Sequence, residues 1–147
     1  MEIVLMRVDE RLIHSEFISK CCGSLHPDHL LVVDEELIEN VFKTNLFRAI
    51  LPLWLDMDVL SPKDAAQYII ENQESKGKLI ILAREPRAFV ELMDAGVRFT
   101  EVTFAEKAYF PNKINIPLKH QPYIARLKEA GVSLVAVSNP NEKSYPV

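Results

Sequence analysis

The sequence predicts an α/β fold, a single doubly wound domain with a mostly parallel sheet of about six to seven strands and helices on both faces. Apolar runs alternate with amphipathic segments in strand, helix, strand, helix order, which is typical of such sheets. Most runs are continuously apolar, as expected of strands covered on both sides. A length of 147 residues, 48% of them hydrophobic, suits one core over 1–147.

Seven segments are expected to form strands. Runs such as "IVLMRV" and "KLIILA" are bounded by charged or turn residues, as buried strands are. The segment 53–60 alternates instead, with Leu53, Leu55 and later apolar residues on one face, so its other face should be more exposed. In chain order, the strands are expected at 3–8, 29–34, 53–60, 78–83, 98–104, 114–118 and 132–137.

Helices are expected where a capping residue precedes an amphipathic segment. Ser15 can cap the first helix and Gly23 can end it, while Pro52 stops the second. Ser61 and Pro62 open the third in the usual cap and first-turn order. The five helices are expected at 15–23, 34–51, 61–72, about 85–95 and 121–131.

Composition limits the function. A net charge of -4 argues against a nucleic-acid surface, which needs a basic excess. No segment has the pattern of a secretory signal or the length of a membrane span, so a cytoplasmic location is expected. Cys21 and Cys22 are expected to be reduced core thiols, and 138–147 to be a flexible tail. No strand or helix has an obvious second apolar face, so no oligomeric state is predicted.

The stretch "RVDERLIHSEF" (7–17) contains the candidate site, because ligands of doubly wound folds bind beyond the carboxyl ends of the strands. Arg11 can pair with phosphate oxygens, and the helix starting near Ser15 offers free N–H groups. His14 is either an ordinary core or surface histidine or a nucleophile toward phosphorus. Asp9 is either a solvated turn acid, like Glu10, or a brace for Arg11 or the imidazole.

Other constellations are weak. The "HPDH" segment (26–29) lacks further ligands at zinc spacing, and His120 has no partners in the sequence, so no metal is expected. The four glycines form neither a dinucleotide fingerprint nor a P-loop, and a serine-hydrolase elbow is missing. A flavodoxin-like binder would need such a phosphate loop, so no cofactor is expected.

The stretch 7–17 resembles the R-[IV]-D-x-R-L-I-H-G-Q-V segment of the IIB components of the mannose/fructose/sorbose family of the bacterial phosphoenolpyruvate-dependent sugar phosphotransferase system. "LLVVDEELIENVFKT", "AREP", "DAGV" and "ARLKEAGVSL" extend the resemblance over most of the chain. It implies that His14 accepts a phosphoryl group from the phosphohistidine of a IIA domain. It further implies that His14 carries this group on Nδ1 and passes it to a sugar held by the membrane IIC/IID complex. Arg11 and Asp9 match residues of the same loop.

Two departures from the family pattern concern charge. Ser15 and Glu16 replace the usual Gly-Gln, and "TFAEKAY" (103–109), with Ala105 and Glu106, replaces a "VGGM" turn. Both changes bring carboxylates toward a site for a dianionic phosphoryl group. Two functions are therefore predicted: a working cytoplasmic phosphocarrier, associated peripherally with its transporter, or a diverged IIB-like binding or regulatory module. The sugar is chosen mainly by the membrane component in this family, so this chain does not name it.

Overall fold

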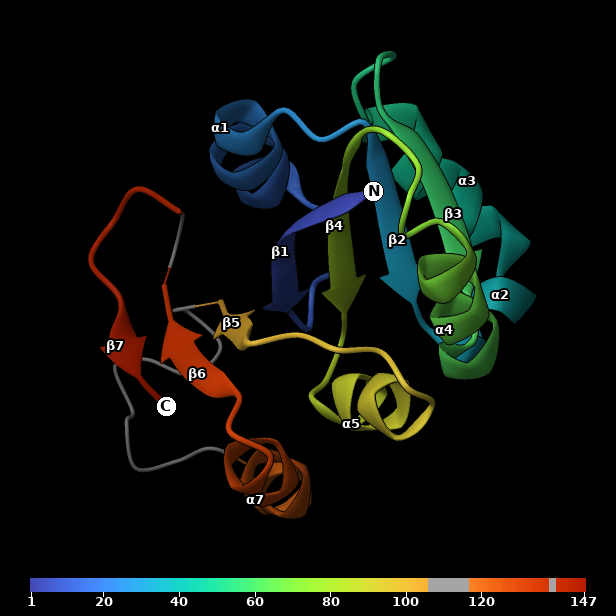
Figure 1. The fold of residues 1–147 in the computed structure, drawn as a ribbon. Helices are drawn as coiled ribbons and strands as arrows, with labels where there is room; N and C mark the ends of the chain where they lie inside the picture. The colour runs from blue at the N-terminus through green and yellow to red at the C-terminus, as the bar shows by residue number, and fades with distance from the viewer. Residues whose placement is uncertain (106–116, 138–139) are drawn as a thin grey trace.

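The computed structural model describes residues 1–105, 117–137 and 140–147, which form a seven-stranded sheet in the order β3-β2-β4-β1-β5-β6-β7 (Figure 1). Neighbouring strands from β3 to β6 are parallel, and β7 pairs antiparallel with β6. The predicted fold class is confirmed. The strands are β1 (Glu2–Val8), β2 (His29–Val33), β3 (Asp56–Leu60), β4 (Lys78–Ala83), β5 (Glu101–Phe104), β6 (Ser133–Ala136) and β7 (Tyr145–Pro146).

Helices cover both faces of the sheet, and each face has its own cluster of buried apolar residues. The first face carries η1 (Phe17–Cys22), which continues into α1 (Gly23–Leu25), together with α2 (Glu35–Glu39) and α3 (Val41–Ile50). The second face carries α4 (Pro62–Glu71), α5 (Arg87–Asp94) and α7 (Gln121–Glu129), the last preceded by the 3₁₀ turn η2 (Leu118–His120).

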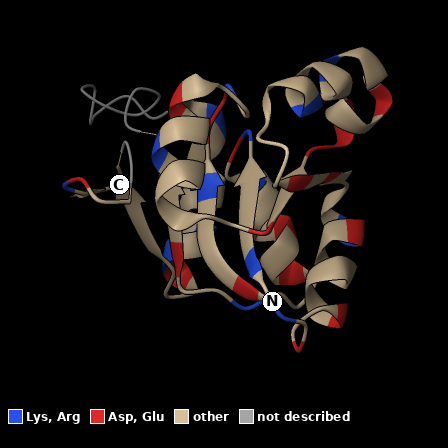
Figure 2. Ribbon diagram, turned by 90° about the horizontal axis from the view of Figure 1, so that it is seen from above, with Lys and Arg blue, Asp and Glu red and all other residues tan. Residues whose placement is uncertain are grey.

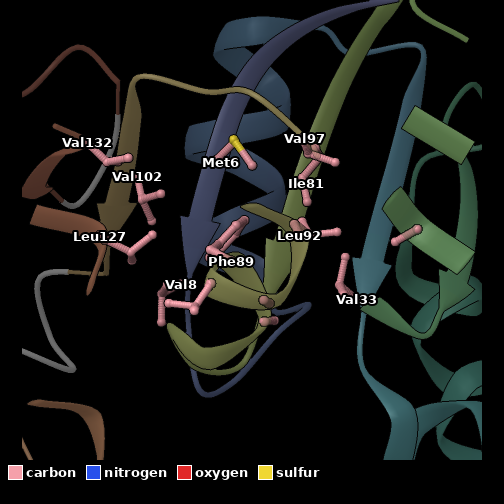
Figure 3. Close-up of a cluster of buried hydrophobic side chains, with 14 of the residues drawn as sticks. Met6, Val8, Val33, Ile81, Phe89, Leu92, Val97, Val102, Leu127 and Val132 are labelled. Carbon is pink, nitrogen blue, oxygen red and sulfur yellow. The ribbon is translucent and has the colours of Figure 1, made fainter. Parts of the chain in front are cut away.

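Alternate residues of each central strand supply the two clusters, as the two-residue period of a strand requires. In β1, Met6 and Val8 join Phe89 and Leu92 of α5 on the second face (Figure 3). Arg7, between them, is buried but belongs to neither cluster. Burial on both sides explains why the central strands read as continuous apolar runs.

The chain leaves β1 and β4 toward opposite faces, although these strands are neighbours. β1 leads to η1 on the first face, and β4 leads to α5 on the second. Val8 lies level with Ala83 of β4 and Phe104 of β5, so the three strands end at one edge. Such a divergence leaves an open crevice at the carboxyl edge, and the loop with His14 starts there.

The first helix differs from its prediction. It does not end at Gly23, which has right-handed helical angles, but runs to Leu25 and ends at His26 with φ of 46°. Leu25 packs against the core of the first face, which keeps the chain helical past the glycine. The Gly23 N–H bonds to the carbonyl of Ile18, five residues back, so the middle of the helix is a π-helix.

The predicted helix at 34–51 is two helices, α2 and α3, because Asn40 interrupts it. Asn40 leaves the helical region at φ -105° and ψ 79°, and its side-chain oxygen accepts the N–H of Lys43 to cap α3. Thr44 Oγ1 then donates to the carbonyl of Leu37 at 3.0 Å, across the junction. Local side-chain bonds of this type compete with a continuous helix. The stop at Pro52 is confirmed.

The third strand starts at Asp56 rather than at residue 53. The N–H of Leu55 bonds to the carbonyl of Pro52 at 3.1 Å and closes a turn, which leaves Leu53 and Trp54 at its exposed corner. The prediction that Leu53 shares the buried face is therefore wrong. Leu55 and Met57 are buried as predicted.

Two predictions near the C-terminus are also corrected. Leu118 begins η2 and is not part of a strand, while 114–116 lie outside the described residues. The segment 138–147 is predicted to be a flexible tail with too little apolar content to pack, but Tyr145 and Pro146 form β7, and the N–H of Val147 bonds to the carbonyl of Leu134. Backbone pairing with the free edge of β6 supplies what the apolar content of this segment lacks.

Candidate phosphoryl-transfer site

Asp9 is the centre of the loop after β1. Its side chain is fully buried, and Oδ2 lies 2.7 Å from Nε2 of His14. Oδ1 accepts the backbone N–H of Arg11 at 3.0 Å and its Nε–H at 3.2 Å, and Arg11 Nη2 donates to Oδ2 at 3.3 Å. The hypothesis that Asp9 braces both Arg11 and the imidazole is the one that the structure supports, and the solvated-acid alternative is wrong.

The loop backbone is held in an uncommon conformation. The N–H of Leu12 bonds to the carbonyl of Asp9 at 3.0 Å, and Leu12 has φ of 56°, in the left-handed region. Such angles are rare for a bulky residue and cost on the order of 1 kcal/mol. Burial of the Leu12 and Ile13 side chains in the first-face cluster offsets that cost. The turn places His14 directly before the helix.

His14, not Ser15, caps this helix. The carbonyl of His14 accepts the N–H of Ile18 at 3.0 Å, and its Nδ1 faces the N–H of Phe17 at 3.4 Å. Ser15 is exposed and lies inside the first turn, so its predicted capping role is wrong. The histidine side chain thus takes the position of a capping oxygen.

The two contacts of His14 define its tautomer. A carboxylate only accepts, so Nε2 carries the proton that points to Asp9. With the proton on Nε2, Nδ1 is the nitrogen that carries the lone pair, and this lone pair accepts the Phe17 N–H at 3.4 Å. The side chain is 18% exposed. The ring therefore presents a nucleophilic nitrogen at a helix N-terminus.

Glu16 adds a second carboxylate, as predicted, but with cations on both sides. Its Oε2 lies 3.8 Å from Nη1 of Arg11, and its Oε1 lies 3.4 Å from Nζ of Lys20. Arg11 is 41% exposed and contacts two carboxylates, the buried Asp9 and the partly exposed Glu16. An anion arriving at Arg11 therefore competes with Glu16.

The other predicted neighbour of the site, Ala105, follows β5 at the same edge. Ala105 is buried, and its N–H bonds to the carbonyl of Val8, the last residue of β1. The loop after β5 therefore begins beside Asp9, whose own N–H bonds to Ala83 of β4. Glu106 lies outside the described residues.

Two buried charged or titratable residues were missed by the sequence reasoning. Arg7 reaches from β1 to the carbonyl of Val137, just after β6, with its Nη1 at 2.9 Å. His120 is buried before α7, where burial lowers its pKa and the nearby carboxylates of Glu85 and Glu10 oppose that shift. An arginine inside an apolar run is the signal that could have identified Arg7, whereas only the tertiary fold gives His120 its neighbours.

The cysteines are buried and unpaired with each other, as predicted. Burial raises the pKa of Cys21, and it raises that of Cys22 to about 12. Thiols of this kind are unreactive at neutral pH because the thiolate is the nucleophilic form. Within 1–105, 117–137 and 140–147, no three His, Cys, Asp or Glu residues are grouped so that they could hold a metal.

A separate cavity of about 360 Å³ lies along the same edge, between the loops after β2 and β4. Its wall includes Arg84, which contacts Asp34 at 3.0 Å and Glu36 at 3.2 Å. His14 does not line it. Basic and acidic residues are also interspersed along the described ribbon, with no wholly basic element (Figure 2).

A comparison with known protein families shows to which family this chain belongs. The family described as PTS system sorbose subfamily IIB component matches residues 3–143. The chain belongs to this family. It is therefore a IIB component of a sugar phosphotransferase system, with the phosphotransferase role of that family.

Characterised relatives of this IIB chain are distant in sequence. It is 24% identical over 117 residues to the sorbose-specific EIIB component of Lacticaseibacillus casei, and the match covers 79% of this chain and 71% of the relative. It is 26% identical over 117 residues to the N-acetylgalactosamine-specific phosphotransferase enzyme IIB component 2 of Escherichia coli, with 78% and 72% covered.

Solved structures agree with the fold of the IIB chain. The IIBSor domain of the sorbose permease from Klebsiella pneumoniae matches with a TM-score of 0.87 at 18% identity, covering 99% of this chain and 93% of that one. The N-acetylgalactosamine-specific IIB component 1 of Escherichia coli matches with a TM-score of 0.85 at 16% identity, covering 99% of both. Among the helices of the described residues, none has the length and apolar character of a membrane span.

Proposed function

We propose that this IIB component carries a phosphoryl group on Nδ1 of His14. The group comes from the phosphohistidine of a IIA domain and goes to a sugar held by a membrane IIC/IID complex, which makes the activity that of a protein-Nπ-phosphohistidine–sugar phosphotransferase. The carrying observation is the pair of contacts on His14, with Asp9 at Nε2 and the helix start at Nδ1.

These contacts suit the transfer step. The Phe17 N–H leaves Nδ1, whose electron pair forms the new P–N bond while the P–N bond of the donor phosphohistidine breaks. The donor nitrogen keeps the electron pair of the broken bond. The proton on Nε2 stays in place, so the phosphorylated ring gains positive charge that the buried Asp9 carboxylate stabilises. Because this chemistry requires positioning and charge stabilisation above all, these residues need no metal for it.

Arg11 and the first turn of the helix receive the phosphoryl oxygens in this proposal. The guanidinium is tied to Asp9 through Nε and Nη2, and Nη1 faces Glu16 at 3.8 Å. The incoming dianion would displace Glu16, because an arginine–phosphate contact combines charge with directed hydrogen bonds. The positive end of the helix dipole adds to this attraction.

The proposed partners follow from the same location. A phosphoryl group passes between two histidines only when both approach closely, so the IIA domain and the IIC/IID complex must each dock over the loop after β1. The partial exposure of His14 and the exposed Glu10 fit such alternating, short-lived contacts. The proposed location is the cytoplasm, at the inner surface of the transporter.

Intact-protein mass spectrometry tests the assignment. The chain is incubated with phosphoenolpyruvate, the general phosphotransferase proteins and a cognate IIA domain, next to His14→Ala and the control His26→Ala. Wild type and His26→Ala should gain one acid-labile phosphoryl group, and His14→Ala none. Phosphorylation of His14→Ala would refute the assignment, and no gain in wild type with a competent IIA would favour the diverged binding module.

A further inference from the structure

Exposed apolar side chains of the described residues gather on one part of the molecule. Seven of them follow one another between α2 and the turn before β3, and we name six of these, all but Val41, the α3 surface. Phe42 is 75% exposed, Leu46 51% and Ile50 52%, and Leu53 is fully exposed. The α3 surface consists of Ile38, Phe42, Leu46, Ile50, Leu53 and Trp54.

α3 is apolar on two sides, contrary to the expectation that no helix has a second apolar face. Phe47 is its one buried residue and points to the core of the first face. Phe42, Leu46 and Ile50 are spaced by four and share another side, because four residues complete little more than one turn. An amphipathic surface helix has a single apolar side, so the second one indicates a missing partner.

The α3 surface is large for a monomer. Its exposed fractions correspond to on the order of 700 Å² of mostly apolar area, whereas the largest patch on a typical monomer is about 300–600 Å². Each partner in a standard-size protein interface contributes about 800 Å². The α3 surface alone therefore supplies nearly the whole of one side of a stable interface.

We propose that the partner is a second copy of this chain, with the two α3 helices packed antiparallel around a two-fold axis at Leu46. In such a dimer the same patch meets itself. Phe42 and Ile50 lie four residues on either side of Leu46, so each faces the other across the axis, and Leu46 faces its own copy. Ile38 of α2 and Leu53 and Trp54 of the turn before β3 extend the apolar surface beyond the two ends of α3.

The charges of α3 do not oppose this contact. Its two basic residues are engaged within their own chain, with Lys43 Nζ 5.7 Å from the centre of the Phe47 ring and Arg48 Nη1 donating to the carbonyl of Met57 at 2.7 Å. α3 contains no acidic residue. The pairing would thus bury apolar groups without desolvating a charge of α3 that has no partner in its own chain, and such a desolvation is costly.

The dimer leaves the phosphoryl site open. α2 and α3 lie beside β2 and β3 at one end of the sheet, whereas β1 and the loop with His14 are at its centre (Figure 1). A IIA domain can then reach each His14 separately. The proposal does not depend on phosphoryl transfer, because the α3 surface contains none of the site residues.

Analytical ultracentrifugation of the full chain tests the dimer. Wild type should sediment as a dimer, and Leu46→Glu, which places two carboxylates together on the axis, as a monomer with an unchanged circular dichroism spectrum. Leu118→Glu is the matched control, because Leu118 is 87% exposed but lies outside the α3 surface, and it should remain dimeric. A wild-type monomer throughout the micromolar to sub-millimolar range, or a dimeric Leu46→Glu, would overturn the proposal.

Cross-linking with a short bismaleimide then tests the antiparallel register. Cys21 and Cys22 are buried and should not interfere. Leu46→Cys should cross-link to itself, whereas Phe42→Cys and Ile50→Cys should cross-link efficiently only when mixed. Strong self-cross-linking of Phe42→Cys alone would instead indicate parallel helices and contradict the two-fold axis at Leu46.

Discussion

The loop after β1 buries a charged side chain, whereas the α3 surface exposes apolar ones. In the loop, a charged side chain, Asp9, is buried completely and satisfied by four contacts from Arg11 and His14. On α3, apolar side chains such as Phe42 and Leu46 stay exposed around one buried residue, Phe47. A satisfied buried charge indicates chemistry within the chain, and an unsatisfied apolar face indicates a partner outside it.

Asp9→Asn should have the largest effect on phosphorylation, because Asp9 is at the centre of the loop after β1. An amide in place of the carboxylate weakens the hold on the Nε2 proton and removes the negative charge that stabilises a phosphorylated ring. We expect phosphorylation of His14 by a IIA domain to fall by about 100-fold or more. Radiolabel transfer measures the rate, and ¹⁵N NMR of the imidazole should show a mixture of tautomers.

Glu10→Gln is the control for Asp9→Asn, because it removes a neighbouring exposed carboxylate that makes none of the contacts of Asp9. Its transfer rate and its imidazole spectrum should match wild type. A similar loss in both variants would show that net charge, rather than the contact to Nε2, controls the reaction.

Replacing a leucine by alanine should destabilise the protein in the loop after β1 but hardly at all on the α3 surface. Leu12→Ala removes a buried side chain from the loop and should lower the free energy of unfolding by about 2–4 kcal/mol. Leu46→Ala removes an exposed side chain and should change the free energy of unfolding of the monomer by less than about 0.5 kcal/mol. Urea denaturation at concentrations that keep the chain monomeric measures both, and equal losses would contradict the comparison.

Glu16→Gln should have the smallest effect, in the opposite direction. It frees Arg11 from a competing carboxylate at 3.8 Å and removes a negative charge near the phosphoryl group. Because both side chains are partly exposed, the contact is worth at most about 1 kcal/mol, so phosphorylation should rise about twofold to fivefold. Lys20→Gln, which leaves the carboxylate in place, should give no rise, and a slower Glu16→Gln would refute the competition.

Part of the site was predictable from the sequence and part was not. The stretch 7–17 identified His14, Arg11 and Asp9, because a charged cluster directly after an apolar strand lies at the carboxyl edge of a parallel sheet. The sequence did not decide whether Asp9 contacts Arg11 and His14, since these contacts depend on the left-handed turn at Leu12. His120 looked isolated because its neighbours, Glu85 and Glu10, are distant in the chain.

The sequence by itself determined the α/β class, the central strands and the place of the site, because apolar periodicity and turn residues act over a few neighbouring positions. Only the tertiary structure decided the pairing of β7 with β6 and the exposure of one side of α3. Each of these depends on which surfaces remain uncovered once the sheet has formed. An apolar side chain reads the same in the sequence whether its own chain covers it or another chain must do so.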